Sequence, residues 1–302
     1  MDRTVTTVID TEKCIGCGLC VKVCPRRIIS MQNEKAVVTG DGSIQCGHCA
    51  IVCPVDAVTV KAVDKESSRF STFAQQNSWL PFGEFDTVEL VRLMGSRRSC
   101  RNYLSKAVDR AILDDLVKIG VTAPSGTNSQ SWTFTILPSR KAVVDLAGRI
   151  AVYFGKLNRV SENRYVRRFL KLIGRPELDE YYREYHDTVE AALTDWKTSG
   201  SDRLLHGATA AIIVASRPGA SCPAEDALLA TQNILLAAHS MGLGTCLIGF
   251  AVQAMRRDIR IKRVLGIPDD EIVYSVIALG YPDERYRQVG VRKKYVQRYY
   301  EA

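Results

Sequence analysis

The sequence has few histidines and no long apolar run, and both absences narrow its function. Only four histidines occur in 302 residues. His186, His206 and His239 lack a second histidine one helical turn away, so we assign them structural roles. The longest apolar stretch, around ATAAIIVAS, is far short of the roughly 18 residues that a membrane span needs. The N-terminal MDRTVTTVID has no signal-peptide core, so we expect a soluble, cytoplasmic protein without a membrane partner.

A glycine-rich dinucleotide turn is also missing, since no G-x-G-x-x-G stands between a predicted strand and a helix. The net charge of +8 comes from basic clusters that acids interrupt, without a nucleic-acid fold motif, so no nucleic-acid partner is expected. An acidic partner protein, an anionic cofactor and plain solvated helix faces remain open as explanations of the basic charge.

Cysteine is unevenly distributed. Seven of the ten cysteines lie between positions 14 and 53, whereas Cys100, Cys222 and Cys246 are scattered over the remaining chain. Single cysteines of this kind are most often small buried hydrophobic residues, and we expect no thiol catalysis from them. The asymmetry divides the chain into a small cysteine-rich part and a large part.

The first cysteine run, CIGCGLCVKVCP, has the spacing C-x2-C-x2-C-x3-C-P. In this spacing three thiolates bind one iron–sulfur cluster, and the fourth cysteine binds another. A structural zinc site uses two separated C-x2-C pairs, and a disulfide scaffold needs a secreted context that this N-terminus does not supply. The run therefore predicts iron–sulfur binding.

The second run, GSIQCGHCAIVCP, has serine where its first cysteine is expected. Together the two runs make the segment from 3 to about 60 resemble a bacterial-type two-cluster ferredoxin domain. The resemblance implies crossed ligation. One cluster would take Cys14, Cys17, Cys20 and Cys53, and the other would take Cys24, Cys46, Cys49 and Ser43.

The serine leaves the second cluster's type open. A serine oxygen is a harder ligand than a thiolate and would hold its iron less firmly. Four outcomes remain: a four-iron cluster with Ser43 or solvent on one iron, a three-iron cluster, ligation by Asp41 instead, or no second cluster.

The remaining chain predicts a linker and a large α+β domain. We place the iron–sulfur domain at 1–62, the linker at 63–86 and the large domain at 87–302, with a helical insertion at about 155–205. Trp79, Leu80 and Phe82 are expected to pin the linker onto the large domain. Periodicity predicts helices near 87–95, 109–121, 140–155, 160–173, 177–198, 224–242 and 252–264, and strands near 133–138, 208–216, 245–249 and 272–280.

Four stretches of the large domain carry its chemistry: SRRSCRNYL at 96–104, APSGTNSQSW at 123–132, MGLGTCLIG at 241–249 and GIPDDEIVYSVIALGYP at 266–282. With them, residues 87–302 resemble the nitroreductase-like FMN-dependent flavoproteins, in which a central sheet is flanked by helices. The resemblance implies a homodimer with FMN in the subunit interface. The FMN-binding residues that it implies are Arg97, Arg98, Ser99, Arg101, Pro124, Ser125, Gly126, Asn128, Leu247, Ile248, Gly249, Arg292 and Lys294.

The resemblance assigns these residues to different parts of FMN. The arginines around Ser99 and the basic tail would bind the phosphate, the 124–128 loop of the partner subunit would edge the ring, and amides near Ile248 and Gly249 would donate to it. No protein side chain is expected to be catalytic, because the reaction takes place on FMN. Members of this family also bind NAD(P)H without the missing glycine-rich turn.

An iron–sulfur domain ahead of a flavin domain predicts a route for electrons. Clusters carry one electron at a time, whereas FMN handles one or two. We expect electrons from a ferredoxin or flavodoxin, or directly from NAD(P)H, to reach FMN and then a small electron-poor acceptor such as a nitroaromatic or a quinone. Two alternatives are a redox storage, sensor or electron-transfer protein without turnover, and a specialised flavin enzyme such as a reductive dehalogenase.

Overall fold

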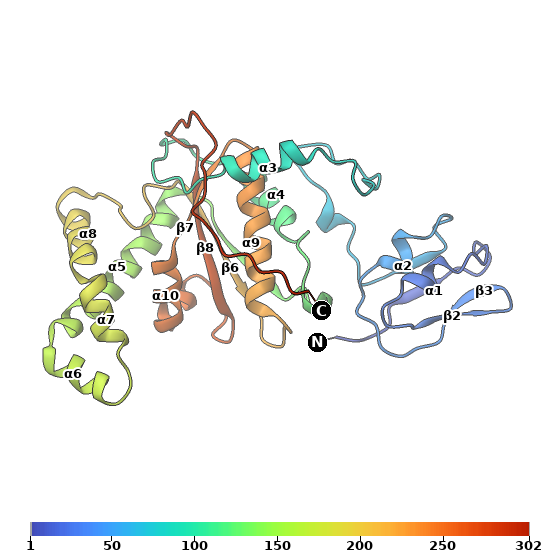
Figure 1. The fold of residues 1–302 in the computed structure, drawn as a ribbon, viewed down its shortest axis with the longest axis horizontal. Coiled ribbons are helices and arrows are strands. Elements are labelled where there is room, and N and C mark those ends of the chain that lie inside the picture. The colour runs from blue at the N-terminus through green and yellow to red at the C-terminus, as the bar shows by residue number, and fades with distance from the viewer. Residues whose placement is uncertain (1, 302) are drawn as a thin grey trace.

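The computed structural model describes residues 2–301 and shows a small N-terminal domain beside a larger one (Figure 1). In the small domain, two antiparallel strand pairs enclose two short helices. Its elements are β1 (Thr7–Ile9), α1 (Leu19–Val23), β2 (Ile29–Gln32), β3 (Lys35–Val38), α2 (His48–Ile51) and β4 (Val58–Val60). β1 pairs with β4, and β2 pairs with β3.

The large domain is built on one four-stranded antiparallel sheet with the strand order β5-β6-β8-β7. Its strands are β5 (Trp132–Leu137), β6 (Ala210–Ser216), β7 (Gly244–Leu247) and β8 (Ile272–Gly280). Its helices are α3 (Thr87–Ser96), α4 (Arg110–Gly120), α5 (Arg140–Glu162), α6 (Arg164–Leu172), α7 (Glu177–Glu184), α8 (His186–Ser199), α9 (Pro223–Ser240), α10 (Gly249–Arg257) and α11 (Ile259–Val264). The predicted α+β fold is confirmed.

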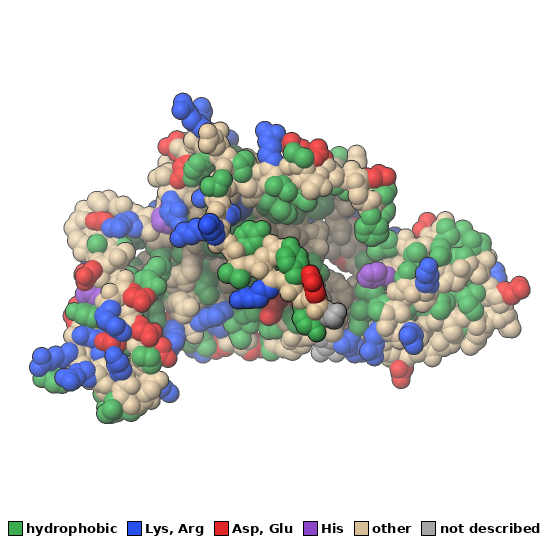
Figure 2. Space-filling view, viewed as in Figure 1, with side chains coloured by type: hydrophobic (Ala, Val, Ile, Leu, Met, Phe, Trp, Pro, Cys, Tyr) green, Lys and Arg blue, Asp and Glu red, His purple; other side chains and the backbone are tan. Residues whose placement is uncertain are grey.

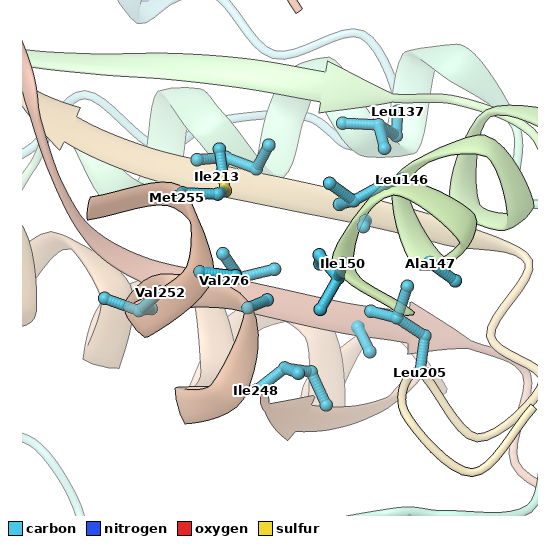
Figure 3. Close-up of a cluster of buried hydrophobic side chains, with 14 of the residues drawn as sticks. Leu137, Leu146, Ala147, Ile150, Leu205, Ile213, Ile248, Val252, Met255 and Val276 are labelled. Carbon is cyan, nitrogen blue, oxygen red and sulfur yellow. The ribbon is translucent and has the colours of Figure 1, made fainter. Parts of the chain in front are cut away.

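Each face of this sheet has its own apolar core. Alternate residues of β6 point to opposite faces, so Ile213 packs against α5 and α10 whereas Ile212 packs with α4 and α9. Figure 3 shows the first of these cores, where Ile150 of α5 and Met255 of α10 converge on the sheet. The sheet is therefore covered by helices on both faces, and the functional segments lie at its edges.

Three short helices, α6 to α8, form an insertion beside α5 (Figure 1). Their tip carries basic side chains on its surface, as Figure 2 shows at the end formed by α6 and α7. Where the insertion packs against α5, an apolar pocket between α5 and α8 is lined by aromatic side chains that include Phe154 of α5, Trp196 of α8 and Phe250 of α10. No helix within residues 2–301 is long and apolar enough to cross a membrane.

The structure corrects three sequence-based expectations about these elements. The single helix expected at 177–198 is broken at Tyr185, and the one expected at 252–264 is broken at Asp258. β7 ends at Leu247, so that Gly249 begins α10 instead of ending a strand. In each case helix caps and backbone geometry, which periodicity does not report, set the boundary.

The expected anchors of the linker are also wrong. Trp79, Leu80 and Phe82 are 69%, 55% and 94% exposed, so they do not pin the segment to this chain. The linker is held instead by the fully buried carboxylate of Asp115 in α4. Asp115 accepts hydrogen bonds from the backbone amides of Ser71 and Thr72 and from the Thr72 hydroxyl at 2.7 Å. A polar contact thus replaces the predicted apolar one.

Candidate functional site

The small domain contains two cavities lined by cysteines. The cavity walls include the two sets expected from crossed ligation. The first cavity is lined by Cys14, Cys17, Cys20 and Cys53. The second is lined by Cys24, Cys46, Cys49 and Ser43. Each cavity thus combines residues from both motifs, because the short helices α1 and α2 lie against each other.

The cysteines surround these cavities without converging on one point. No three His, Cys, Asp or Glu residues among residues 2–301 could hold a single metal ion. This arrangement does not fit a zinc ion, whose four ligands meet at about 2.3 Å, but it fits a cluster that presents separate iron corners. The backbone amide of Ala57 donates to the Cys53 sulfur at 3.2 Å, as expected around a cluster thiolate.

Burial affects the protonation of the cysteines that line these cavities. It raises the pKa of the Cys20 and Cys49 thiols, whereas backbone amides of Ala36 and Gly16 hold the pKa of Cys14 below its usual range. A buried neutral thiol that binds iron must lose its proton, so cluster assembly would release protons in this domain.

Ser43 lies where the fourth ligand of the second cavity is expected. Its side chain is buried, and its hydroxyl oxygen accepts a hydrogen bond from the Gln45 amide at 2.9 Å. Its own amide donates to the Arg3 carbonyl, which fixes the loop to the N-terminal segment. Arg26, which also lines this cavity, places a cation at a position where negative charge would be stabilised. Ser43 therefore lines the cavity with a donor already directed at its oxygen.

In the large domain, three arginines gather beside the β7 edge of the sheet. Burial first, and then the neighbouring guanidinium groups of Arg292 and Arg98, lower the pKa of Arg97. None of these three arginines pairs with a carboxylate among the described residues. Ser99 lies next to them and forms a parallel bridge with Thr245 of β7. Cations held together without an acidic partner indicate a site for an anion such as a phosphate.

Two further residues belong to the predicted phosphate site. The backbone amide of Arg101 donates to Glu284 at 3.1 Å, while the guanidinium groups of Arg101 and Arg97 both act against the burial that raises the pKa of the Cys246 thiol. Lys294 lies in the exposed C-terminal tail, and no contact brings it to the arginine cluster in the described chain. The structure therefore brings together Arg97, Arg98 and Arg292, with Arg101 near Arg97 beside Cys246.

The loop at 124–130 lies at the opposite edge of the sheet and leads into β5. Thr127, Asn128 and Gln130 all have positive φ angles of 44° to 56°, an unusual backbone for residues other than glycine. The amide of Gly126 and the hydroxyl of Ser129 both donate to the buried carboxylate of Asp226 in α9, at 2.8 and 3.0 Å. Asp226 therefore holds the loop in shape.

Asp226 was missed by the sequence reasoning. It stands in the first turn of α9, after Pro223, where acidic residues are common at a helix N-terminus. No sequence signal separates such a helix-end residue from one that holds a loop about 100 positions away. Pro124 and Ser125 lie in the same loop, and the Ser125 hydroxyl accepts from the Gln130 amide.

The predicted amide donors at 247–249 need one correction. The Ile248 amide donates to the Val276 carbonyl of β8 at 2.9 Å, so it is not available to a ligand. Gly249 begins α10, and the space where its side chain would be is open. Leu247 is 48% exposed beside it. The open donor at this position is therefore the N-terminus of α10 rather than Ile248.

Comparison with protein families matches both parts of the chain. Residues 94–281 match the nitroreductase family, and residues 7–30 match the 4Fe-4S binding domain. Ferredoxin-2 of Desulfomicrobium norvegicum is 53% identical over 32 residues, which is 11% of this chain and 54% of that protein.

Several known proteins are similar to the large domain. A protein of Archaeoglobus fulgidus named for NADH dehydrogenase or NAD(P)H nitroreductase activity is 25% identical, covering 65% of this chain and 87% of its own. The 4-nitrobenzoate reductase of a Nocardioides strain is 28% identical over 64% and 81%. Iodotyrosine deiodinase 1 of Rattus norvegicus is 24% identical over 64% and 62%.

Among solved structures, a nitroreductase of Bacteroides fragilis with bound FMN shares the fold. It superimposes with a TM-score of 0.52 at 23% identity, covering 69% of this chain and 97% of that chain.

Proposed function

The chain belongs to the nitroreductase family, and we propose that it is an FMN- and iron–sulfur-dependent oxidoreductase that transfers electrons from a ferredoxin or flavodoxin to a small electron-poor acceptor. Nitroaromatics and quinones are the acceptor classes. The observation that carries the proposal is the presence, in one chain, of cysteine-lined cavities and an arginine cluster without acidic partners. Bound FMN would accept single electrons and release them in pairs.

The chain's own residues would bind and orient this cofactor. Arg97, Arg98 and Arg292 would hold its phosphate, with the Ser99 hydroxyl as a short-range donor. The open α10 N-terminus at Gly249 would donate toward the ring. Two iron–sulfur clusters in the crossed arrangement, one with a non-cysteine ligand at Ser43, would receive electrons one at a time.

A homodimer is part of the proposal, and the sheet order supports it. The arginine cluster lies beside β7 and the 124–130 loop precedes β5, at opposite edges of a four-stranded sheet. Three inter-strand spacings separate these edges by about 14 Å. A second copy whose loop lay beside the arginine cluster of the first would let one flavin touch both. The apolar side chains exposed on α3, including Val88 at 72% and Val91 at 61%, would be covered by that copy.

The proposal is tested by comparing two electron donors, reduced ferredoxin and NADPH. The basic charge of the chain suits an acidic one-electron carrier, whereas the A. fulgidus relative is named for NAD(P)H. The purified holoprotein should reduce a nitroaromatic steadily with reduced ferredoxin, and the rate should fall when the clusters are removed. Full flavin turnover by NADPH in cluster-free protein would overturn the relay. Absence of steady acceptor consumption would support the storage or sensor alternative.

Reductive dehalogenation is the second candidate, because iodotyrosine deiodinase is among the similar proteins. The aromatic-lined pocket between α5 and α8 would suit the ring of a halogenated phenol. Halide release under the same reducing conditions separates this reaction from nitro reduction. A protein that releases halide but leaves nitroaromatics unchanged would favour the second candidate.

A further inference from the structure

One hydrogen bond joins the small domain to the loop that the proposed function places at the flavin. The Asn128 side-chain amide donates to the Ile44 carbonyl at 2.9 Å. Ile44 is itself a wall of the cavity that contains Ser43. A residue lining the Ser43 cavity therefore contacts the flavin loop directly, although the two residues are 84 positions apart in the chain.

The contact is held firmly on both sides. The Asn128 side-chain oxygen accepts from Gln130 at 2.9 Å, so both ends of its amide are engaged. The loop around it is fixed by the buried carboxylate of Asp226. On the other side, the Ser43 amide bonds to the Arg3 carbonyl and fixes the cavity wall. The relative position of the two domains at this contact is therefore set by two loops, each fixed by its own hydrogen bonds.

The other cysteine cavity has no such connection. Its walls come from residues 14–58, and no hydrogen bond within the described chain joins residues 14–20 to the large domain. Cys17 and Ile15 are exposed there, Ile15 by 62%. The Ser43 cavity thus faces the flavin loop, and the Cys14 cavity is open toward an external carrier.

The sheet order is compatible with a crossing between subunits. The flavin loop of one chain lies at the edge opposite its own arginine cluster, so in the proposed dimer it would edge the flavin that the partner's arginines hold. We propose that the iron–sulfur domain of each subunit supplies electrons, through its Ser43 side, to the flavin anchored on the other subunit. Asn128 is the positioning residue for this transfer. The inference rests on the proposed FMN-binding dimer.

Electrons balance in this route. Reduced ferredoxin gives one electron to the iron–sulfur domain in each pass, and one electron crosses from the Ser43 side to the flavin. Two passes oxidise two ferredoxins and supply the pair that the acceptor takes up with protons from water. No covalent bond to a protein atom forms or breaks.

Mixed dimers test the crossing directly. One chain carries Cys46→Ala, which removes a thiolate of the Ser43 cavity, and the other carries Arg97→Ala with Arg292→Ala, which removes the phosphate anchor. Each homodimer should lack flavin reduction by reduced ferredoxin, because one lacks the cluster and the other lacks the flavin. The mixed dimer should regain it at one of its two sites, where an intact anchor meets an intact domain of the other chain.

The reciprocal mixture gives the opposite result. Wild-type chain is paired with a chain that carries all three substitutions. Neither flavin site then combines an intact anchor with an intact iron–sulfur domain of the other chain, so fast reduction should be absent. Fast reduction in this mixture, and none in the first, would overturn the inference in favour of transfer within one subunit.

Asn128→Ala tests the contact without removing a cluster. Hydrogen–deuterium exchange of the holoprotein should rise roughly fivefold over residues 43–47, the effect of one lost hydrogen bond, and stay unchanged over 14–20. Asn233→Ala is the matched control, because its side chain bonds only to Thr122 within the large domain. Unchanged exchange at 43–47 would refute the role of Asn128.

Three measurements separate this inference from the proposed function. FMN, iron and sulfide are counted for every protein, and far-ultraviolet circular dichroism checks that each variant is folded. Dithionite, which reduces the flavin without a protein carrier, shows that the flavin site is intact. If wild-type dimers bind FMN and accept electrons from ferredoxin while the mixed dimers behave as for transfer within one subunit, only the crossing is wrong. If wild-type protein binds no FMN, the proposed function itself fails.

Discussion

The two cysteine cavities share one local scaffold and differ in one ligand and in what they face. In each half a glycine with positive φ, Gly18 at 71° and Gly47 at 75°, precedes a short helix that buries a cysteine, Cys20 or Cys49. The second half then has Ser43 in place of a cysteine, and it faces the large domain. The fold of the two halves is thus nearly repeated, while their chemistry and position are not.

This difference shows that an internal repeat need not give two equivalent sites. The backbone that shapes a cluster site is kept in both halves because glycine supplies the left-handed conformation that other residues rarely adopt. A single side chain can then change one site without disturbing the other. The changed site is the one whose wall contacts the loop at 124–130, so the asymmetry coincides with the domain contact.

The largest effect is expected from breaking the crossed arrangement. Cys53 belongs to the second motif, but Cys53→Ala should remove the ordinary four-thiolate cluster of the first cavity. Cys24→Ala should remove the cluster of the Ser43 cavity. Each variant should lose about half of its bound iron. Iron and sulfide counts with electron paramagnetic resonance spectra check the result.

Cys222→Ala is the control, since this cysteine lies outside both cavities and should leave iron content unchanged. The two cysteine variants should lose different spectra. If both lose the same spectrum, ligation is not crossed.

A second prediction tests how the small domain is held beside the large one. Asp115→Ala removes the acceptor of the linker amides and should destabilise the protein by about 3 kcal/mol, because buried donors lose a charged partner. Thermal unfolding and the rate of proteolysis within 63–86 measure this. Asp114→Ala, one residue earlier and exposed, is the matched control and should have little effect.

The same carboxylate gives a pH dependence. Burial alone raises the pKa of Asp115, but hydrogen bonds from Thr72 and Ser71 outweigh it and hold the pKa below its usual range. A lowered pKa stabilises the linker contact above the ordinary aspartate value of about 3.9, and the stabilisation is lost as the pH falls further. Proteolysis of the linker with an acid-active protease should therefore accelerate in wild type, but not in Asp115→Ala.

The smallest effects are expected from substitutions of Ser43 that make the two cavities alike or remove the serine oxygen. Ser43→Cys should convert the second cluster to an ordinary four-thiolate one, and unchanged spectra and iron content would contradict the ligand role. Ser43→Ala should cost about 1 kcal/mol of stability through loss of the Gln45 hydrogen bond. Ser30→Ala, on an exposed strand away from the cavity, is the comparison for unfolding.

Much of this arrangement could be predicted from local sequence. The spacing of Cys14, Cys17 and Cys20 indicated that these three would line one cavity. The resemblance to two-cluster ferredoxins implied that Cys53 would join them and that Ser43 would belong to the other cavity. The helices around Leu113 and Ile234 follow the period of their apolar residues, and both are fully buried. The alternation of Ile212 and Ile213 between two cores explains why β6 appears as a continuous apolar run.

What could not be predicted depends on contacts between distant segments. The sequence predicts that Asn128 belongs to a flavin-binding loop. Nothing in the neighbouring sequence indicates that its side-chain amide bonds to Ile44. The Ile248 amide was expected to be open, but strand pairing with β8 uses it. Apolar Phe82 was expected to be buried, yet this chain alone offers it no cover. The FMN-binding roles of the individual residues remain predictions.

The exposed apolar side chains of the linker have a consequence for biosynthesis. Trp79, Phe82 and Phe85 are more than half exposed, and they leave the ribosome before the sheet of the large domain is complete. A new chain therefore presents adhesive surface throughout the synthesis of more than 200 later residues. If the proposed dimer forms, the yield of active protein should depend on how soon two such chains meet, and dilution should favour aggregation or capture by chaperones.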